Sequence, residues 1–158
     1  MVVYYLDTSA LIKRYVQEQG TTWIANLTGY GTIHRIYTAR LAGPEAIATF
    51  FRKARGGEIT HARANQLTNN FRTDWQQQYR VLSISVSVTN RAMLLAQRYG
   101  LRGADALHLA AALELHYARQ TQQTLLQLPP LTFVSADVEQ LKAAQAEGLP
   151  VENPDNHT

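Results

Sequence analysis

The sequence predicts an α/β fold with three α/β/α layers, in which helices cover both faces of a central parallel sheet. Short apolar runs such as VVYYL and LTFVS have the length and composition of buried parallel strands. A segment with helical periodicity follows each run, and strands that alternate with helices favour parallel pairing. The 158 residues are 46% hydrophobic, which is enough for one sizeable core. We therefore expect one domain over residues 1–158.

In the first half of the chain, glycine and proline mark the expected ends of the elements. The run VVYYL leads directly into Asp7 and a helix that we expect Gly20 to close. Pro44 suits the first turn of a helix, which places Glu45 in that turn. The expected strands are 2–6 and a short strand within 33–39, and the expected helices are 9–20, 21–28, 44–57 and one within 59–79.

The helix expected within 59–79 has a narrow apolar stripe. Leu67, Phe71 and Trp75 recur at four-residue spacing on an otherwise polar segment. This stripe packs either on the core or on a partner, and it offers a surface on which to test dimerisation.

The second half of the chain is expected to continue the alternation. The segment ADALHLAAALELHYARQ is apolar on nearly all sides, which predicts a buried helix with Asp105 in its first turn. A polar stretch then interrupts before LTFVS, and Asp137 follows that strand. The expected elements are a strand at 81–86, a helix at 89–100, the helix at 104–120, a strand at 131–135, a helix at 138–148, a strand at 149–153 and a flexible tail at 152–158.

Composition excludes several classes of site. The chain has no cysteine, so it has no disulfide, no thiolate zinc site and no cysteine nucleophile, and any metal takes oxygen or imidazole ligands. No apolar run approaches the roughly 20 residues that span a bilayer, and the N-terminus lacks the features of a signal peptide. We therefore expect a cytoplasmic protein that does not bind a membrane.

The charge balance favours a polyanionic partner. The net charge is +3 with a pI near 9.3, and twelve of the fifteen basic residues are arginine. Arginine binds phosphate through a planar fork of donors, whereas lysine offers a point charge. Solvated helix faces are the simpler explanation for any single arginine, so the charge alone does not prove a nucleic-acid partner.

Four widely separated acids are expected at one edge of the sheet. Asp7 directly follows one strand, Asp137 lies just past the end of another, and Glu45 and Asp105 lie in first turns of helices. Ligands of open α/β sheets collect outside the carboxyl ends of the strands. Four crowded carboxylates raise one another's pKa unless cations lie between them, and hard divalent ions such as magnesium bind such oxygen ligands. Each acid alone can also be explained as a helix cap or a first-turn acid, so the prediction depends on all four together.

The segments around these acids resemble the PIN-domain nucleases, and within them the VapC-type toxins of toxin–antitoxin pairs. YYLDTSALIKRY is similar to the first acidic motif of that family, RLAGPEAIATF to the second, RGADALHLAAAL to the third and LTFVSADVEQLKAAQAEGLPV to the terminal segment. The third motif is the most specific and the second is the weakest. The segment ARQTQQTLLQLPP is longer than usual in the family, and we expect it to lengthen a helix or loop at the edge.

The resemblance implies a PIN-like endoribonuclease that depends on Mg²⁺ or Mn²⁺, forms homodimers and is inhibited by a small antitoxin. It assigns Asp7, Glu45, Asp105 and Asp137 as the catalytic and metal-binding acids. An RNA-maturation nuclease without an antitoxin is an alternative.

Three polar residues near these acids are secondary candidates. Thr8 and Ser135 match hydroxyl positions that orient carboxylates or water, and Arg102 either binds phosphate or pairs with a site carboxylate. His108 follows Asp105 by one helical turn, but a histidine in so apolar a helix is more often a satisfied core residue, so we leave it out of the site.

Two rival functions remain open at this point. In phosphotransferases and phosphatases an aspartate after a strand is the nucleophile, as Asp7 would be, but those enzymes resemble one another in a second aspartate two positions on, where this chain has Ser9. A non-catalytic domain that binds RNA or protein ranks below the nuclease, because all four acids are present.

Overall fold

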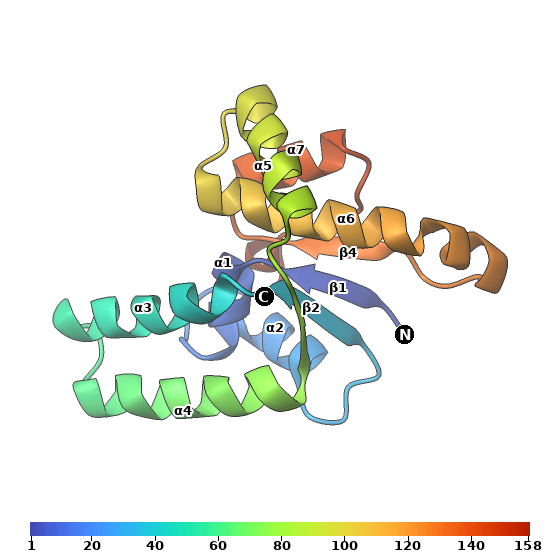
Figure 1. Ribbon diagram of the computed structural model, residues 1–158. Helices are drawn as coiled ribbons and strands as arrows, with labels where there is room; N and C mark the ends of the chain where they lie inside the picture. The colour runs from blue at the N-terminus through green and yellow to red at the C-terminus, as the bar shows by residue number, and fades with distance from the viewer.

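Five parallel strands form the central sheet of the computed structural model, which describes residues 1–158 (Figure 1). The strands lie in the order β3-β2-β1-β4-β5. The chain therefore builds outward from β1 in one direction, and then crosses to the other side of β1 to add β4 and β5. Their bounds are β1 Val3–Leu6, β2 Arg35–Ala39, β3 Tyr79–Leu82, β4 Leu131–Val134 and β5 Val151–Glu152.

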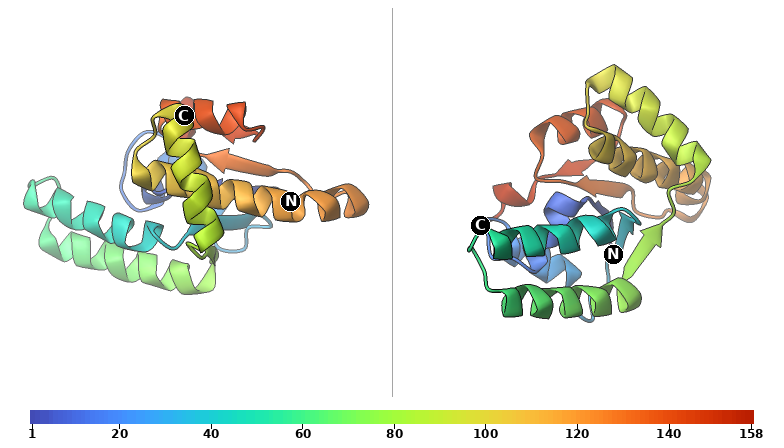
Figure 2. Two further views of the ribbon diagram at one scale, coloured as in Figure 1. Left: turned by 45° about the horizontal axis from the view of Figure 1, so that its top comes forward. Right: turned by 60° about the vertical axis from the view of Figure 1, so that its left-hand side comes forward.

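Seven α-helices cover the two faces of the sheet, which confirms the three-layer α/β/α fold (Figures 1 and 2). One face is covered by α1 Thr8–Leu11, α2 Thr21–Thr28, α3 Ala42–Arg55 and α4 His61–Gln77. The other face is covered by α5 Val86–Tyr99, α6 Gly103–Leu126 and α7 Val138–Ala146. None of these helices combines the length and hydropathy that crossing a membrane requires.

The central strands have buried side chains on both faces, because helices pack against each. Along β1, Val3 and Tyr5 belong to the core under α5, α6 and α7, whereas Leu6 belongs to the core under α1 to α4. In β4, Phe133 stacks on Tyr5 with ring centroids 5.5 Å apart. Alternate residues of one strand thus anchor two separate hydrophobic layers, which is the reason that VVYYL and LTFVS are mostly apolar.

The first expected helix is much shorter in the structure. It ends as α1 at Leu11, a 3-10 turn follows at Ile12–Arg14, and Gly20 precedes α2 instead of closing the helix before it. The backbone turns here because Lys13 is buried and donates to the carbonyl of Gln19. The expectation of a continuous helix to Gly20 was wrong, because a buried cation and its partners outweigh local helical periodicity.

The apolar stripe of α4 packs inside the molecule. Leu67 and Phe71 are buried in the same core as Phe50 of α3, and Trp75 lies half-buried beside Phe71. Figures 1 and 2 show α3 and α4 running side by side. Of the two possibilities for this stripe, the structure therefore selects the core, and the stripe is no longer a candidate surface for a partner.

Two element boundaries differ from expectation in the second half of the chain. The strand expected at 81–86 begins at Tyr79 and ends at Leu82, because Ser85 caps α5 by accepting a hydrogen bond from the amide of Val88. The polar stretch after residue 120 does not interrupt α6, which continues to Leu126 and ends at Gln127 with a positive φ of 52°. The longer segment seen in the sequence therefore lengthens a helix at the edge, as expected.

The last residues contact the body of the protein, unlike the flexible tail expected at 152–158. A 3-10 turn spans Pro154–Asn156, and Asp155 pairs with the buried Lys13 at 2.8 Å. His157 stacks on Trp23 of α2 with ring centroids 4.1 Å apart. These contacts join the C-terminal segment to the turn between α1 and α2.

Gly20 provides a test of this contact. Its φ is +84°, and an added Cβ would lie 2.5 Å from the carbonyl oxygen of Pro154, whereas Gly57 has a similar φ of +78° and open space around it. We predict that Gly57→Ala lowers the free energy of unfolding by about 1 kcal/mol, the cost of left-handed backbone alone. Gly20→Ala should lower it at least twice as much in urea denaturation. Equal losses would show that the C-terminal segment does not hold its place against α2.

Candidate active site

A polar pocket lies at the carboxyl ends of the central strands. Asp7 follows β1 and Ser135 follows β4, and these two strands are neighbours at the point where the strand order reverses. The crevice at such a switch point is the usual ligand site of an open α/β sheet. The pocket has a volume of about 370 Å³ and is lined by Asp7, Thr8, Ser9, Ile12, Glu45, Thr49, Arg52, Arg102, Ala104, Asp105, His108 and Asp137. All four acids selected from the sequence therefore lie around one pocket.

Asp7 is the most firmly held of the four carboxylates. Its side chain is 3% exposed, and its Oδ1 accepts hydrogen bonds from the Ser9 hydroxyl at 2.7 Å and the Ala10 amide at 2.9 Å. The Ser135 hydroxyl donates to Oδ2 at 2.6 Å. Burial raises the pKa of Asp7, although the charge of His108 and these hydrogen bonds oppose the rise. The carboxylate is thus fixed in orientation, and its neighbours offset only part of the cost of burying its negative charge.

Glu45 is oriented by Thr8 and His108. The Thr8 hydroxyl donates to Oε1 of Glu45 at 2.7 Å, and Nε2 of His108 lies 2.8 Å from the same oxygen. Burial acts to raise the pKa of Glu45, but the hydrogen bonds from His108 and Thr8, with the charges of His108 and Arg52, hold it below its ordinary value. Glu45 therefore faces the pocket as a carboxylate with one oxygen already bonded.

His108 is a core residue and a pocket residue at once. It is 2% exposed, as the sequence predicted, and its Nδ1 lies 2.8 Å from the hydroxyl of Tyr5. Burial raises the pKa of Tyr5 well above its ordinary value, so this hydroxyl keeps its proton beside Nδ1. Nε2 bears the proton that His108 donates to Glu45. The spacing from Asp105 to His108 places both on one side of a helix, and this signal could have included His108 in the site.

Asp105 and Asp137 are joined by Arg102. Nε of Arg102 donates to Oδ2 of Asp105 at 3.2 Å, and Nη2 lies 3.6 Å from Oδ2 of Asp137. Oδ1 of Asp137 accepts from the amides of Glu139 at 2.9 Å and Gln140 at 3.1 Å. Asp137 is therefore the N-cap of α7 through one oxygen, which was the helix-cap explanation considered from the sequence. Its other oxygen is turned toward Arg102.

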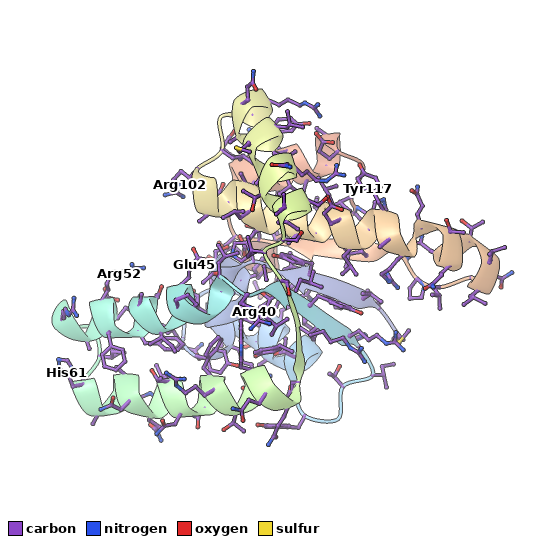
Figure 3. The ribbon with its side chains drawn as sticks, viewed as in Figure 1. Arg40, Glu45, Arg52, His61, Arg102 and Tyr117 are labelled. Carbon is purple, nitrogen blue, oxygen red and sulfur yellow. The ribbon has the colours of Figure 1, made fainter.

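Two pocket residues from α3 were not selected from the sequence. The side chain of Arg52 donates to the hydroxyl of Thr49 at 3.1 Å, and this hydroxyl donates to the carbonyl of Glu45. Figure 3 shows Arg52 extending from α3 on the side that faces the start of α6, where Arg102 lies. Their positions, four and seven residues after Glu45, place all three on one face of α3, which is the signal that could have identified them.

The donor set suits a hard divalent cation, but the side chains are not grouped around one. The four acids offer only carboxylate oxygens, the ligands that Mg²⁺ and Mn²⁺ prefer. No three Asp, Glu or His side chains form a group that could hold a metal ion in this conformation. Glu45 is bonded to Thr8 and His108, and Asp105 and Asp137 share Arg102. The residues fit such an ion chemically, and binding one requires some of these side chains to turn.

The comparison with known sequences finds two similar proteins of Mycobacterium tuberculosis. They are Ribonuclease VapC45 of strain CDC 1551 / Oshkosh and Ribonuclease VapC49 of strain ATCC 25618 / H37Rv. Each is 31% identical to this chain over 113 residues, which cover 72% of this chain and 76% of the relative. No family profile matches the chain.

Solved structures share the fold at low sequence identity. The structure of FitAB bound to an IR36 DNA fragment matches with a TM-score of 0.64 and 16% identity, covering 96% of this chain and 94% of that one. A toxin–antitoxin complex from Klebsiella pneumoniae matches with a TM-score of 0.55 and 17% identity, covering 98% of both chains. At these identities the similarity shows a common fold.

The capping role of Asp137 can be separated from its role in the pocket. We predict that Asp137→Ala lowers the free energy of unfolding by about 1 kcal/mol, because α7 loses a side-chain acceptor. Asp137→Asn keeps an acceptor and should stay close to the parent protein in urea denaturation. If Asp137→Asn is as destabilising as Asp137→Ala, the cap does not account for the contribution of Asp137 to stability.

Burial of Asp7 predicts a pH dependence in metal-free buffer. Its pKa in the folded protein is raised, so the folded state holds this proton more tightly than the unfolded state. The parent protein therefore loses stability relative to Asp7→Asn as the pH rises from about 4 through the raised value. With EDTA present, Asp7→Asn should be the more stable protein at pH 7, and the difference in melting temperature should shrink toward pH 4. A difference that does not change with pH would contradict the raised pKa.

Proposed function

The chain belongs to the VapC ribonuclease family, and from this premise we propose that it is a metal-dependent endoribonuclease and the toxin of a toxin–antitoxin pair. One observation carries the chemical part of the proposal: four carboxylates from four separate parts of the chain line one pocket at the switch point of the sheet. The names of the two relatives supply the reaction, because both are ribonucleases.

Asp7, Glu45, Asp105 and Asp137 are the residues that would hold Mg²⁺ or Mn²⁺. When bound, such an ion lowers the pKa of an attacking water and offsets the charge that grows on the phosphate. The surrounding residues supply orientation. Ser9 and Ser135 fix the plane of the Asp7 carboxylate from two sides, and Thr8 and His108 hold one oxygen of Glu45.

A phosphodiester substrate fits the charges at the mouth of the pocket. Arg52 forms no ion pair and makes one hydrogen bond, to Thr49, so its other donors can bind a phosphate oxygen beside the acids. The basic balance of the whole chain also favours a polyanion. The alternative with Asp7 as a nucleophile is disfavoured, because both of its oxygens already accept hydrogen bonds and its side chain is buried.

An antitoxin and a second copy of this chain are the proposed protein partners, and the protein is proposed to act in the cytoplasm. The similar structures include a toxin–antitoxin complex, which supports the first partner. For the second partner, the proposed contact surface is formed by the exposed apolar residues Val86, Met93 and Leu94 of α5, because the stripe of α4 is buried.

The proposed dimer surface is tested by light scattering. Leu94→Glu should abolish the dimer, whereas Leu126→Glu, which changes an exposed leucine at the far end of α6, should leave it intact. A dimer in both variants would exclude this surface.

The nuclease proposal is tested by cleavage of RNA. We predict that the purified protein cuts total cellular RNA into discrete fragments with Mg²⁺ or Mn²⁺ and not with EDTA. Asp105→Asn should lower cleavage at least 100-fold, a loss of about 2.7 kcal/mol of transition-state stabilisation, because one carboxylate ligand is removed. Arg98→Gln, which removes an ion pair with Glu147 outside the pocket, serves as the control with unchanged cleavage.

The outcome distinguishes the nuclease from a binding domain. Folded protein that binds RNA but leaves it intact with every metal would favour a non-catalytic RNA-binding domain. Cleavage that Asp105→Asn retains would place the active site elsewhere on the chain.

A further inference from the structure

Arg102 occupies an unusual position for a cation. It is the N-cap residue of α6, a helix of 24 residues, and its side chain makes no capping hydrogen bond. The amino end of a helix carries partial positive charge, so helix stability alone disfavours an arginine there. Its side chain is 83% exposed and is held instead by ion pairs with Asp105 and Asp137. The carboxylates, and not the helix, account for the place of this guanidinium.

The guanidinium lies between the two carboxylates that face it. Its Nε and Nη2 form one edge of the planar fork, and this edge can bind both oxygens of a single carboxylate or phosphate. Here the two nitrogens contact different residues, Oδ2 of Asp105 and Oδ2 of Asp137. A cation that binds both of these oxygens directly would need the space that the guanidinium fills. The same contacts help to explain why the acids are not grouped around an ion.

Arg52 provides the contrast within the same pocket. It carries the same charge, but its only side-chain hydrogen bond is to Thr49, and it pairs with no acid. The charge of Arg52 thus acts on the pocket through space, whereas Arg102 blocks two carboxylate oxygens directly.

We propose that Arg102 is an internal counter-ion that competes with the divalent cation for Asp105 and Asp137, and that on release it binds a phosphate of the RNA through the same edge. This inference rests on the proposed function and adds an order of events to it. In the free protein Arg102 offsets the charge of two acids. Figure 3 shows Arg102 at the start of α6. When a cation replaces it, the exposed side chain is free to turn toward the substrate at the mouth of the pocket.

The first measurement is Mn²⁺ affinity without RNA, by isothermal titration calorimetry on the full chain. We predict that Arg102→Gln binds Mn²⁺ about 3- to 10-fold more tightly than the parent protein, because two exposed ion pairs no longer compete. Arg52→Gln controls for loss of a nearby charge and should give a smaller gain. Arg98→Gln removes an ion pair outside the pocket and should give none. The gain of Arg102→Gln should shrink as KCl is added, because exposed pairs are screened.

The second measurement is the KM for a short RNA at saturating Mn²⁺. Arg102→Gln should raise the KM several-fold, so that one substitution strengthens metal binding and weakens RNA binding. A purely structural role does not produce these opposite changes, and circular dichroism confirms that each variant is folded.

Different results overturn different conclusions. Unchanged or weaker Mn²⁺ binding by Arg102→Gln, or a gain no larger than that of Arg52→Gln, overturns the counter-ion role while the nuclease proposal stands. An unchanged KM overturns the phosphate contact. If the parent protein neither binds Mn²⁺ nor cleaves RNA, the proposed function fails, and the counter-ion role fails with it.

Discussion

The pairing of β1 with β4 is the contact on which the candidate site depends. It places Ser135 beside Asp7, although 128 positions separate them, and the hydrogen bond between them is 2.6 Å long. Both residues directly follow their strands, so the parallel register determines the distance between them. Ser9 joins the same group, because its hydroxyl donates to Asp7 and accepts from the amide of Ala136. The orientation of the buried carboxylate is thus a consequence of sheet register.

The two hydrophobic layers support this contact from both sides. Tyr5 illustrates the coupling, because its ring stacks on Phe133 while its hydroxyl bonds to His108, which in turn bonds to Glu45. A continuous path of packed and hydrogen-bonded groups therefore runs from the core under α6 to the pocket. Rotation of His108 would leave the Tyr5 hydroxyl and Nδ1 buried without partners, a cost that keeps the imidazole in place.

Charge within the pocket is balanced unevenly between its two sides. Asp7 and Glu45 are held by hydroxyl, amide and imidazole donors on rigid elements, whereas Asp105 and Asp137 face an exposed guanidinium. The first pair keeps its geometry because its partners are buried. The second pair has a partner that can move into solvent at low cost, because exposed ion pairs are weak. This asymmetry places the adaptable part of the site at its mouth.

The sequence by itself determined the class of fold, the strands that precede Asp7 and Asp137, and the helix turns that contain Glu45 and Asp105, because apolar periodicity and turn residues act locally. It did not determine the end of α1 or the packing of the C-terminal segment, since both depend on the buried Lys13 and its distant partner Asp155. The helical spacing of His108 from Asp105 and of Arg52 from Glu45 placed each residue on the same helix face as an acid, and the packing of α6 and α3 over the sheet edge brought both into the pocket. The tertiary structure decided the end of α1, the place of the C-terminal segment and the shared pocket, because they arise from contacts between residues far apart in the chain.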